Sequence, residues 1–114
     1  MKQINKDQAL AAIRNGEFGE DIIRSAEKVT VILTQSWCPQ WHAMQQFVGD
    51  ILTADVWLLE YDRVDYCDAF REFKETKLRN NQIPYIRYYS DGILVAQSNA
   101  VTRELFQLYL EKLP

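Results

Sequence analysis

Buried strands are the clearest elements in the apolar pattern of the chain. Val29–Thr34 is rich in β-branched residues and has apolar side chains on both faces of the strand. This pattern is typical of a strand that is covered on both sides. Val56–Tyr61 has the same character and predicts a second buried strand. Pro84–Tyr89 and Ile93–Gln97 flank the turn Ser90-Asp91-Gly92, so together they predict a β-hairpin.

Apolar residues at helical spacing predict helices between and after these strands. One runs over about 39–52 with Pro39 in its first turn, and one opens at Asp65 and Asp68. The last begins near Thr102 and is expected to bury Leu105, Phe106, Tyr109 and Leu113.

Two shorter helices are predicted before the first strand. Asn5 with Gln8 resembles a capping box and indicates a helix over about 5–14, which ends at Asn15-Gly16. A second short helix is expected around Glu20–Ala26.

The order of these elements predicts an α/β fold. From residue 29 it reads strand, helix, strand, helix, strand, strand, helix, which implies a right-handed crossover and a parallel strand pair, with the hairpin adding antiparallel strands. We therefore expect a mixed four-stranded sheet flanked by helices, with an N-terminal helical extension. No linker or repeat divides the chain, so residues 1–114 are expected to form a single domain with a core over about 28–113.

Composition narrows the possible functions. The chain has 114 residues, of which 47% are hydrophobic, and this length can support a core without a metal or disulfides. A net charge of -3 without a block of like charge argues against nucleic-acid and membrane partners. No segment approaches the ~20 apolar residues of a membrane span. The first residues lack the apolar core of a secretory signal, so we expect a cytoplasmic protein with reduced thiols and no cofactor.

Cys38 is the first candidate for chemistry. It lies between the end of the Val29–Thr34 strand and the start of a helix, at the sheet edge where ligands of such folds gather. Helix amino termini favour the thiolate form of a cysteine. Trp37 and Trp41 are expected to flank the sulfur. The alternative is that Cys38 is only a small residue in a tight turn.

These residues resemble the thioredoxin superfamily. The resemblance is carried by Trp37-Cys38-Pro39-Gln40-Trp41 after a core strand, and by Ile83-Pro84 before a hairpin that turns at Gly92. It covers about residues 20 to 113 and implies a thioredoxin-like fold. It also implies that Cys38 is the attacking cysteine and Pro84 a cis-proline opposite it. Ile83 would offer its backbone to an extended peptide or a glutathione-like substrate.

Two departures from the family pattern limit what the resemblance implies. Trp41 occupies the place of the second, resolving cysteine, so ordinary dithiol exchange is excluded. Ile32 occupies the place of the buried acid that thioredoxins have six residues before the first cysteine. The protein either acts through one thiol, as monothiol glutaredoxins do, or retains the scaffold for binding alone.

Cys67 and His42 are secondary candidates. Cys67 is expected in the first turn of the third core helix, at the same sheet edge as Cys38. It is either paired with Cys38, or packed beneath its helix, or a free reactive thiol. His42 follows Cys38 by four residues, but three His and Cys side chains in total are too few for a structural zinc site, so no metal is expected. Asp62, Asp65 and Asp68 are read as a helix cap and solvated surface.

Two functional hypotheses follow from the sequence. The first is a possible monothiol thiol-disulfide oxidoreductase that forms mixed disulfides through Cys38 with a protein or low-molecular-weight thiol. Its substrate groove would be shaped by Trp37, Pro39, Trp41, Ile83 and Pro84. The second is a non-catalytic interaction module with the thioredoxin fold.

Overall fold

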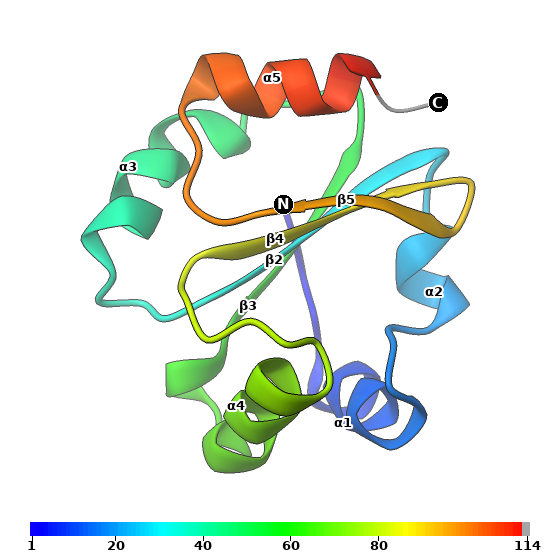
Figure 1. The fold of residues 1–114 in the computed structure, drawn as a ribbon, viewed down its shortest axis with the longest axis vertical. Coiled ribbons are helices and arrows are strands. Elements are labelled where there is room, and N and C mark those ends of the chain that lie inside the picture. The colour runs from blue at the N-terminus through cyan, green and yellow to red at the C-terminus, as the bar shows by residue number, and fades with distance from the viewer. Residues whose placement is uncertain (113–114) are drawn as a thin grey trace.

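Residues 1–112, which are those described by the computed structural model, form a β-sheet with helices on both faces (Figure 1). The strands are β1 (Lys2–Gln3), β2 (Lys28–Thr34), β3 (Asp55–Glu60), β4 (Tyr85–Ser90) and β5 (Ile93–Ser98). The helices are α1 (Lys6–Asn15), α2 (Glu20–Ile23), α3 (Pro39–Val48), α4 (Cys67–Thr76) and α5 (Arg103–Lys112), with a short 3-10 helix, η1, at Tyr61–Arg63. The predicted α/β class and element order are confirmed.

The central strand of the sheet is β2. The order across the described part of the chain is β1-β3-β2-β4-β5, with β2 parallel to β3 and antiparallel to β4. The carboxyl ends of β2 and β3 therefore meet at one edge of the sheet. β4 and β5 form the predicted hairpin, and the turn places Asp91 and Gly92 at φ values of 52° and 78°, a region that glycine enters freely.

The predicted four-stranded sheet is wrong by one strand. β1 pairs in parallel with the outer side of β3, with Lys2 opposite Trp57 and Gln3 opposite Leu58. The backbone N–H of Ile4 continues the pairing by donating to the carbonyl of Leu58 at 3.0 Å. Two residues are too few to show an alternating pattern, so the sequence gives no sign of this strand.

Two helices end earlier than the apolar pattern predicts. α2 stops at Ile23 rather than at Ala26, and α3 stops at Val48 rather than at residue 52. Gly49 is the C-cap of α3, and beyond it Leu52 is 94% exposed. A glycine loses more backbone entropy in a helix than any other residue, which favours an end at this position.

The caps and faces of the last two helices also differ in part from expectation. Asp65 does not cap α4, because the N-cap is Tyr66, without a side-chain hydrogen bond, and Asp65 instead pairs with Lys6 at 2.9 Å. In α5, Leu105 is 41% exposed, so its predicted burial is wrong. The buried residues of α5 are Phe106 and Leu110, while Leu113 lies outside the described residues. Within residues 1–112, no helix combines the length and apolarity needed to cross a membrane.

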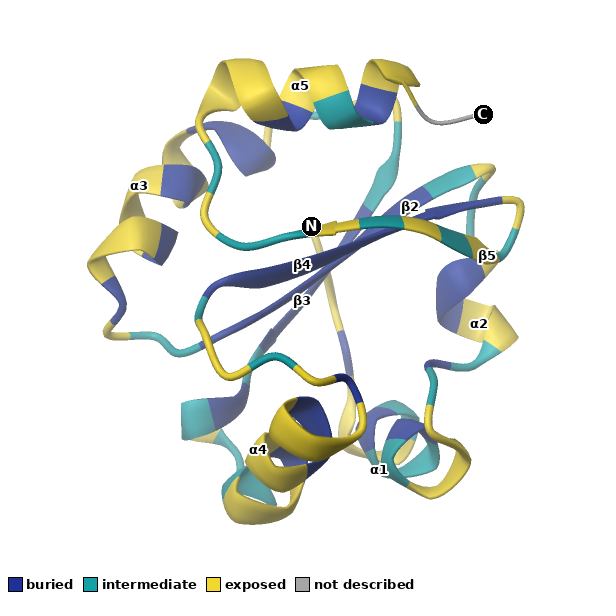
Figure 2. Ribbon diagram, in the orientation of Figure 1, coloured by how far each residue is buried: buried dark blue, intermediate teal, exposed yellow. Residues whose placement is uncertain are grey.

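The two faces of the sheet carry separate apolar clusters. One cluster joins Val31 and Leu33 of β2 to residues of α1, α2 and α4. The other joins Ile32, from the same strand, to residues of α3 and α5. In Figure 2, β2 and β4 are almost continuously buried, whereas each long helix has one buried and one exposed side. We call the cluster that contains Val31 and Leu33 the α4-side cluster, and the cluster that contains Ile32 the α3-side cluster.

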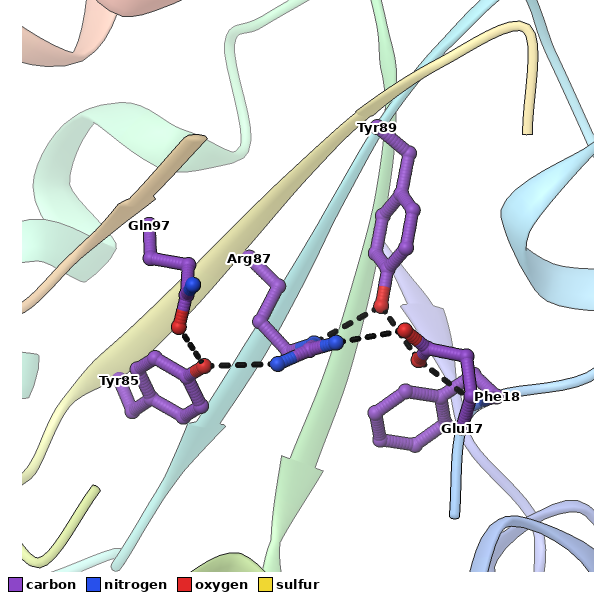
Figure 3. Close-up of polar contacts among 6 residues, drawn as sticks. All are labelled: Glu17, Phe18, Tyr85, Arg87, Tyr89 and Gln97. Carbon is purple, nitrogen blue, oxygen red and sulfur yellow. Dashed lines mark hydrogen bonds and ion pairs between the residues drawn. The ribbon is translucent and has the colours of Figure 1, made fainter. Parts of the chain in front are cut away.

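A buried polar network joins the N-terminal extension to β4 on the α4 side (Figure 3). Arg87 donates to the hydroxyls of Tyr85 and Tyr89, both at 2.8 Å, and to a carboxylate oxygen of Glu17 at 2.5 Å. The other oxygen of Glu17 accepts from the hydroxyl of Tyr89 at 2.6 Å, and the hydroxyl of Tyr85 donates to Gln97. A buried guanidinium is tolerated only with such partners, so this network fixes the 16–19 loop against the sheet.

Candidate functional site

Cys38 is the N-cap residue of α3, directly after the turn that follows β2. Pro39 stands at the first helical position, which suits its fixed φ and missing N–H. The backbone of Cys38 closes the turn by donating to the carbonyl of Gln35 at 3.2 Å, and its own carbonyl accepts from the N–H of His42 at 3.0 Å. The thiol therefore lies beside the positive end of the helix dipole.

The sulfur of Cys38 lies against the segment that precedes β4. Its Sγ is 3.9 Å from the carbonyl oxygen of Ile83, which accepts from the thiol, and the residue is 4% exposed. The Ile83–Pro84 peptide bond is cis. Ile83 is half-buried and Pro84 is buried. The tertiary structure thus brings together two segments that are 45 residues apart in the sequence.

The two tryptophans near Cys38 have opposite environments. Trp37 is 61% exposed, and its indole N–H donates to the side chain of Gln35 at 2.5 Å. Trp41 is fully buried in the α3-side cluster, and its indole N–H donates to a carboxylate oxygen of Glu60 at 2.9 Å. Of these two side chains, only that of Trp37 is therefore exposed at the surface.

Asp62 holds the turn that carries Trp37 and Cys38. One carboxylate oxygen accepts from the N–H of Ser36 at 2.8 Å, and the other accepts from its hydroxyl at 2.5 Å. Burial acts to raise the pKa of Asp62, but these hydrogen bonds outweigh it and hold that pKa below its usual value. The sequence pattern predicts solvated surface for Asp62, but the residue is half-buried. The relevant signal was its place just after β3, at the edge where β2 also ends.

Cys67 lies apart from Cys38. Both cysteines are free, and Cys67 is the first residue of α4. Cys38 belongs to the α3-side cluster, whereas Cys67 is half-buried against the α4-side cluster. The two thiols therefore pack on opposite faces of the sheet, although both follow parallel strands at the same edge.

His42 is exposed on α3, where its Nε2 is 2.5 Å from the carbonyl oxygen of Ser36. This contact points the ring toward the turn before Cys38. Among residues 1–112, no group of three His, Cys, Asp or Glu side chains is placed to hold a metal ion.

Comparisons with known proteins find similarity in structure alone, since no family model and no curated protein sequence matches the chain. Oxidised thioredoxin O1 from Arabidopsis thaliana aligns over 98% of this chain and 96% of its own, with a TM-score of 0.70 and 9% identity. Oxidised mitochondrial thioredoxin 3 from Saccharomyces cerevisiae aligns over 99% and 95%, with a TM-score of 0.70 and 13% identity. A mutated buckwheat glutaredoxin aligns over 93% and 89%, with a TM-score of 0.56 and 13% identity. The chain therefore has the fold of the thioredoxin superfamily.

Proposed function

We propose that this chain is a thiol redox protein that acts through Cys38 alone. The observation that carries the proposal is the position of Cys38 at the N-cap of α3, with its sulfur 3.9 Å from the carbonyl oxygen of Ile83. A thiol beside a helix amino terminus is favoured as a nucleophile, and the backbone next to it can pair with an extended partner.

The proposed reaction is a thiol-disulfide exchange in two steps. The Cys38 thiol loses its proton to water, and the thiolate attacks one sulfur of a substrate disulfide. A bond forms between Cys38 and that sulfur, while the substrate S–S bond breaks and the other sulfur leaves as a thiolate that takes up a proton. An external thiol then attacks the substrate sulfur of the mixed disulfide. The bond between Cys38 and that sulfur breaks, and Cys38 takes up the proton of the external thiol. The external and substrate sulfurs leave together as a new disulfide.

The proposed partner is an extended protein segment or a low-molecular-weight disulfide such as glutathione disulfide. Exposed Trp37 and Pro39 would form one wall of its site, and half-buried Ile83, which precedes buried Pro84, the other. Trp41 is fully buried and has no surface for a partner. Its proposed role is therefore to pack in the same cluster as Cys38 and stabilise the position of that residue. A reaction that consumes an external thiol suits the reducing cytoplasm, which is the location we propose.

The external thiol is needed because the chain offers Cys38 no resolving partner. Trp41 fills the position at which a second cysteine would stand and is held there by Glu60. Cys67, the remaining thiol, packs on the opposite face of the sheet. Both observations support exchange through a single thiol.

The test is mixed-disulfide formation with glutathione disulfide, followed by mass spectrometry of the intact protein and of its peptides. We expect the Cys67→Ser variant to gain one glutathione on Cys38, and the Cys38→Ser variant to gain none at a comparable rate. Absence of the adduct from Cys38 in the folded Cys67→Ser protein would exclude the proposed reaction.

A second candidate is a binding module that does no redox chemistry. The observation in its favour is the 4% exposure of Cys38, since a sulfur this enclosed is poorly accessible to a disulfide. Under this hypothesis Cys38→Ser leaves the affinity for a peptide partner unchanged, while under the first it abolishes covalent capture. The two hypotheses are distinguished by titrating the wild-type protein and the Cys38→Ser variant with the same peptide, once with and once without a disulfide.

A further inference from the structure

Lys74 is a fully buried lysine on the side of α4 that faces the sheet. Its ammonium contacts backbone and amide oxygens. Nζ donates to the carbonyl of Gln82 at 2.7 Å and to the carbonyl of Asn80 at 2.9 Å, and it lies 3.5 Å from the side-chain oxygen of Asn80. It also lies 5.6 Å from the ring centre of Tyr85. An ion is costly to bury, so this arrangement calls for an explanation.

The oxygens that Lys74 contacts belong to the loop between α4 and β4. This loop has no regular structure between Leu78 and Pro84 and depends on side chains for its shape. Asn80 accepts from the N–H of Gln82 at 3.0 Å. Asn99, from beyond β5, donates to Asn80 and to the carbonyl of Pro84, both at 3.1 Å. Lys74 and Asn99 therefore hold the loop from two different elements.

The loop that Lys74 holds ends beside Cys38. Gln82 directly precedes Ile83, whose carbonyl contacts the sulfur of Cys38. We propose that Lys74 is a positioning residue, which fixes the Ile83 backbone beside Cys38 so that an extended disulfide partner can pair with it. The inference rests on the proposed function for its substrate, but the geometry of the loop can be measured without it.

An ammonium fits this role better than a neutral side chain would. It has three donors and meets three oxygens, whereas an apolar side chain of similar length would leave the carbonyls of Asn80 and Gln82 without this partner. Burial lowers the pKa of Lys74 to about 8, so at pH 7 the charged form still predominates.

The first experiment compares two disulfide probes that share a leaving group. One is bis(2-hydroxyethyl) disulfide, and the other is a short peptide whose central cysteine is disulfide-bonded to 2-mercaptoethanol. All proteins carry Cys67→Ser, so that Cys38 is their sole thiol. Lys74→Met removes the donors at similar length, and Lys77→Met is the matched control because Lys77 is exposed at the end of the same helix.

We expect Lys74→Met to slow capture of the peptide by Cys38 by about tenfold and capture of the small disulfide by less than about threefold. Lys77→Met should change neither rate. A purely structural role would lower both rates together, and that result, or no change in either, would overturn the inference.

The second experiment measures amide hydrogen exchange at Gln82 by NMR. We expect Lys74→Met to accelerate exchange of this amide by about tenfold while the β2 amides keep their protection. Unchanged exchange at Gln82, or equal acceleration throughout the sheet, would contradict positioning. If the Met variant does not fold, Lys74→Gln takes its place with one donor group retained. Failure of both variants to fold would assign Lys74 to stability alone.

The two experiments separate this inference from the proposed function. If the Lys77→Met control captures neither probe, single-thiol exchange fails, and Lys74 is then judged by the exchange of Gln82 alone. If capture is normal but Lys74→Met captures both probes as well as the control does, the proposed function stands and the positioning role fails.

Discussion

Trp37 and Trp41 are four residues apart, yet one is largely exposed and the other is fully buried. The sequence predicted that both flank Cys38. It could not predict this difference, because Trp41 is buried by residues of other elements and donates its indole N–H to Glu60, at the end of β3. Similarly, neither the contact between Cys38 and Ile83 nor the role of Asp62 follows from local spacing, since both join segments distant in sequence. The position of Cys38 itself was predictable, because a strand, a turn and Pro39 define it.

The hydrogen bond between Trp41 and Glu60 predicts a contrast between two substitutions. Glu60→Ala leaves the buried indole N–H without its acceptor and should lower the free energy of unfolding by about 1–3 kcal/mol. Glu60→Gln retains an oxygen acceptor and should cost much less. Urea unfolding of both variants measures the difference, and equal losses would show that the acceptor is not what stabilises Trp41.

The buried ammonium of Lys74 predicts an unusual dependence of stability on pH. Its pKa is about 8 in the folded state and 10.5 when unperturbed, so between these values the unfolded chain binds more protons. Stability contributed by this group therefore rises with pH across that window. Relative to Lys74→Met, the wild-type protein should gain about 2 kcal/mol between pH 7.5 and pH 9.5 in urea unfolding. A flat difference would show that the lysine titrates normally.

At the scale of elements, the ends of helices were harder to predict than their existence. The predicted capping box of α1 is confirmed, since both of its hydrogen bonds form, and it is predictable because its two residues lie within four positions of each other. Asp65 looked like a similar cap for α4, but its carboxylate reaches Lys6, at the start of α1. A local pattern is reliable when no distant group competes for the same side chain, and here one does.

This difference between Asn5 and Asp65 can be tested by alanine substitution. Asn5→Ala removes the cap of α1 and should lower the free energy of unfolding by about 1 kcal/mol. Asp65→Ala removes an exposed ion pair and no cap, so it should leave stability unchanged within error. Thermal unfolding of both variants measures the contrast. A larger loss for Asp65→Ala would mean that this residue caps α4 in solution.

At the scale of the whole molecule, the sheet core was predictable and the attachment of the N-terminal extension was not. Central strands such as β2 are apolar on both faces, and this pattern can be recognised without knowing which elements pack against the strand. β1 and the Glu17–Arg87 network have no such pattern, because each depends on a partner more than fifty residues away. Among the described residues, the only carboxylate that forms an ion pair with the Arg87 guanidinium is nevertheless that of Glu17, in the N-terminal extension.

Removal of that carboxylate should therefore lower the stability of the folded chain. Glu17→Ala leaves the buried guanidinium without its counter-ion and should cost about 2 kcal/mol, less than for a fully buried pair because the Glu17 side chain is 37% exposed. Glu20→Ala is the matched control, since its pair with Arg24 lies on the surface and contributes little. Equal losses in urea unfolding would show that the network does not fix the extension.

Whether Cys38 works without a second thiol of its own chain can be measured by following the fate of its mixed disulfide. Wild-type protein is reacted with glutathione disulfide, freed of excess reagent and held without any external thiol while mass spectrometry follows the adduct. We predict that the glutathione stays on Cys38 until dithiothreitol is added, because Cys67 packs on the opposite face of the sheet. Spontaneous release of glutathione with formation of a Cys38–Cys67 disulfide would contradict the account.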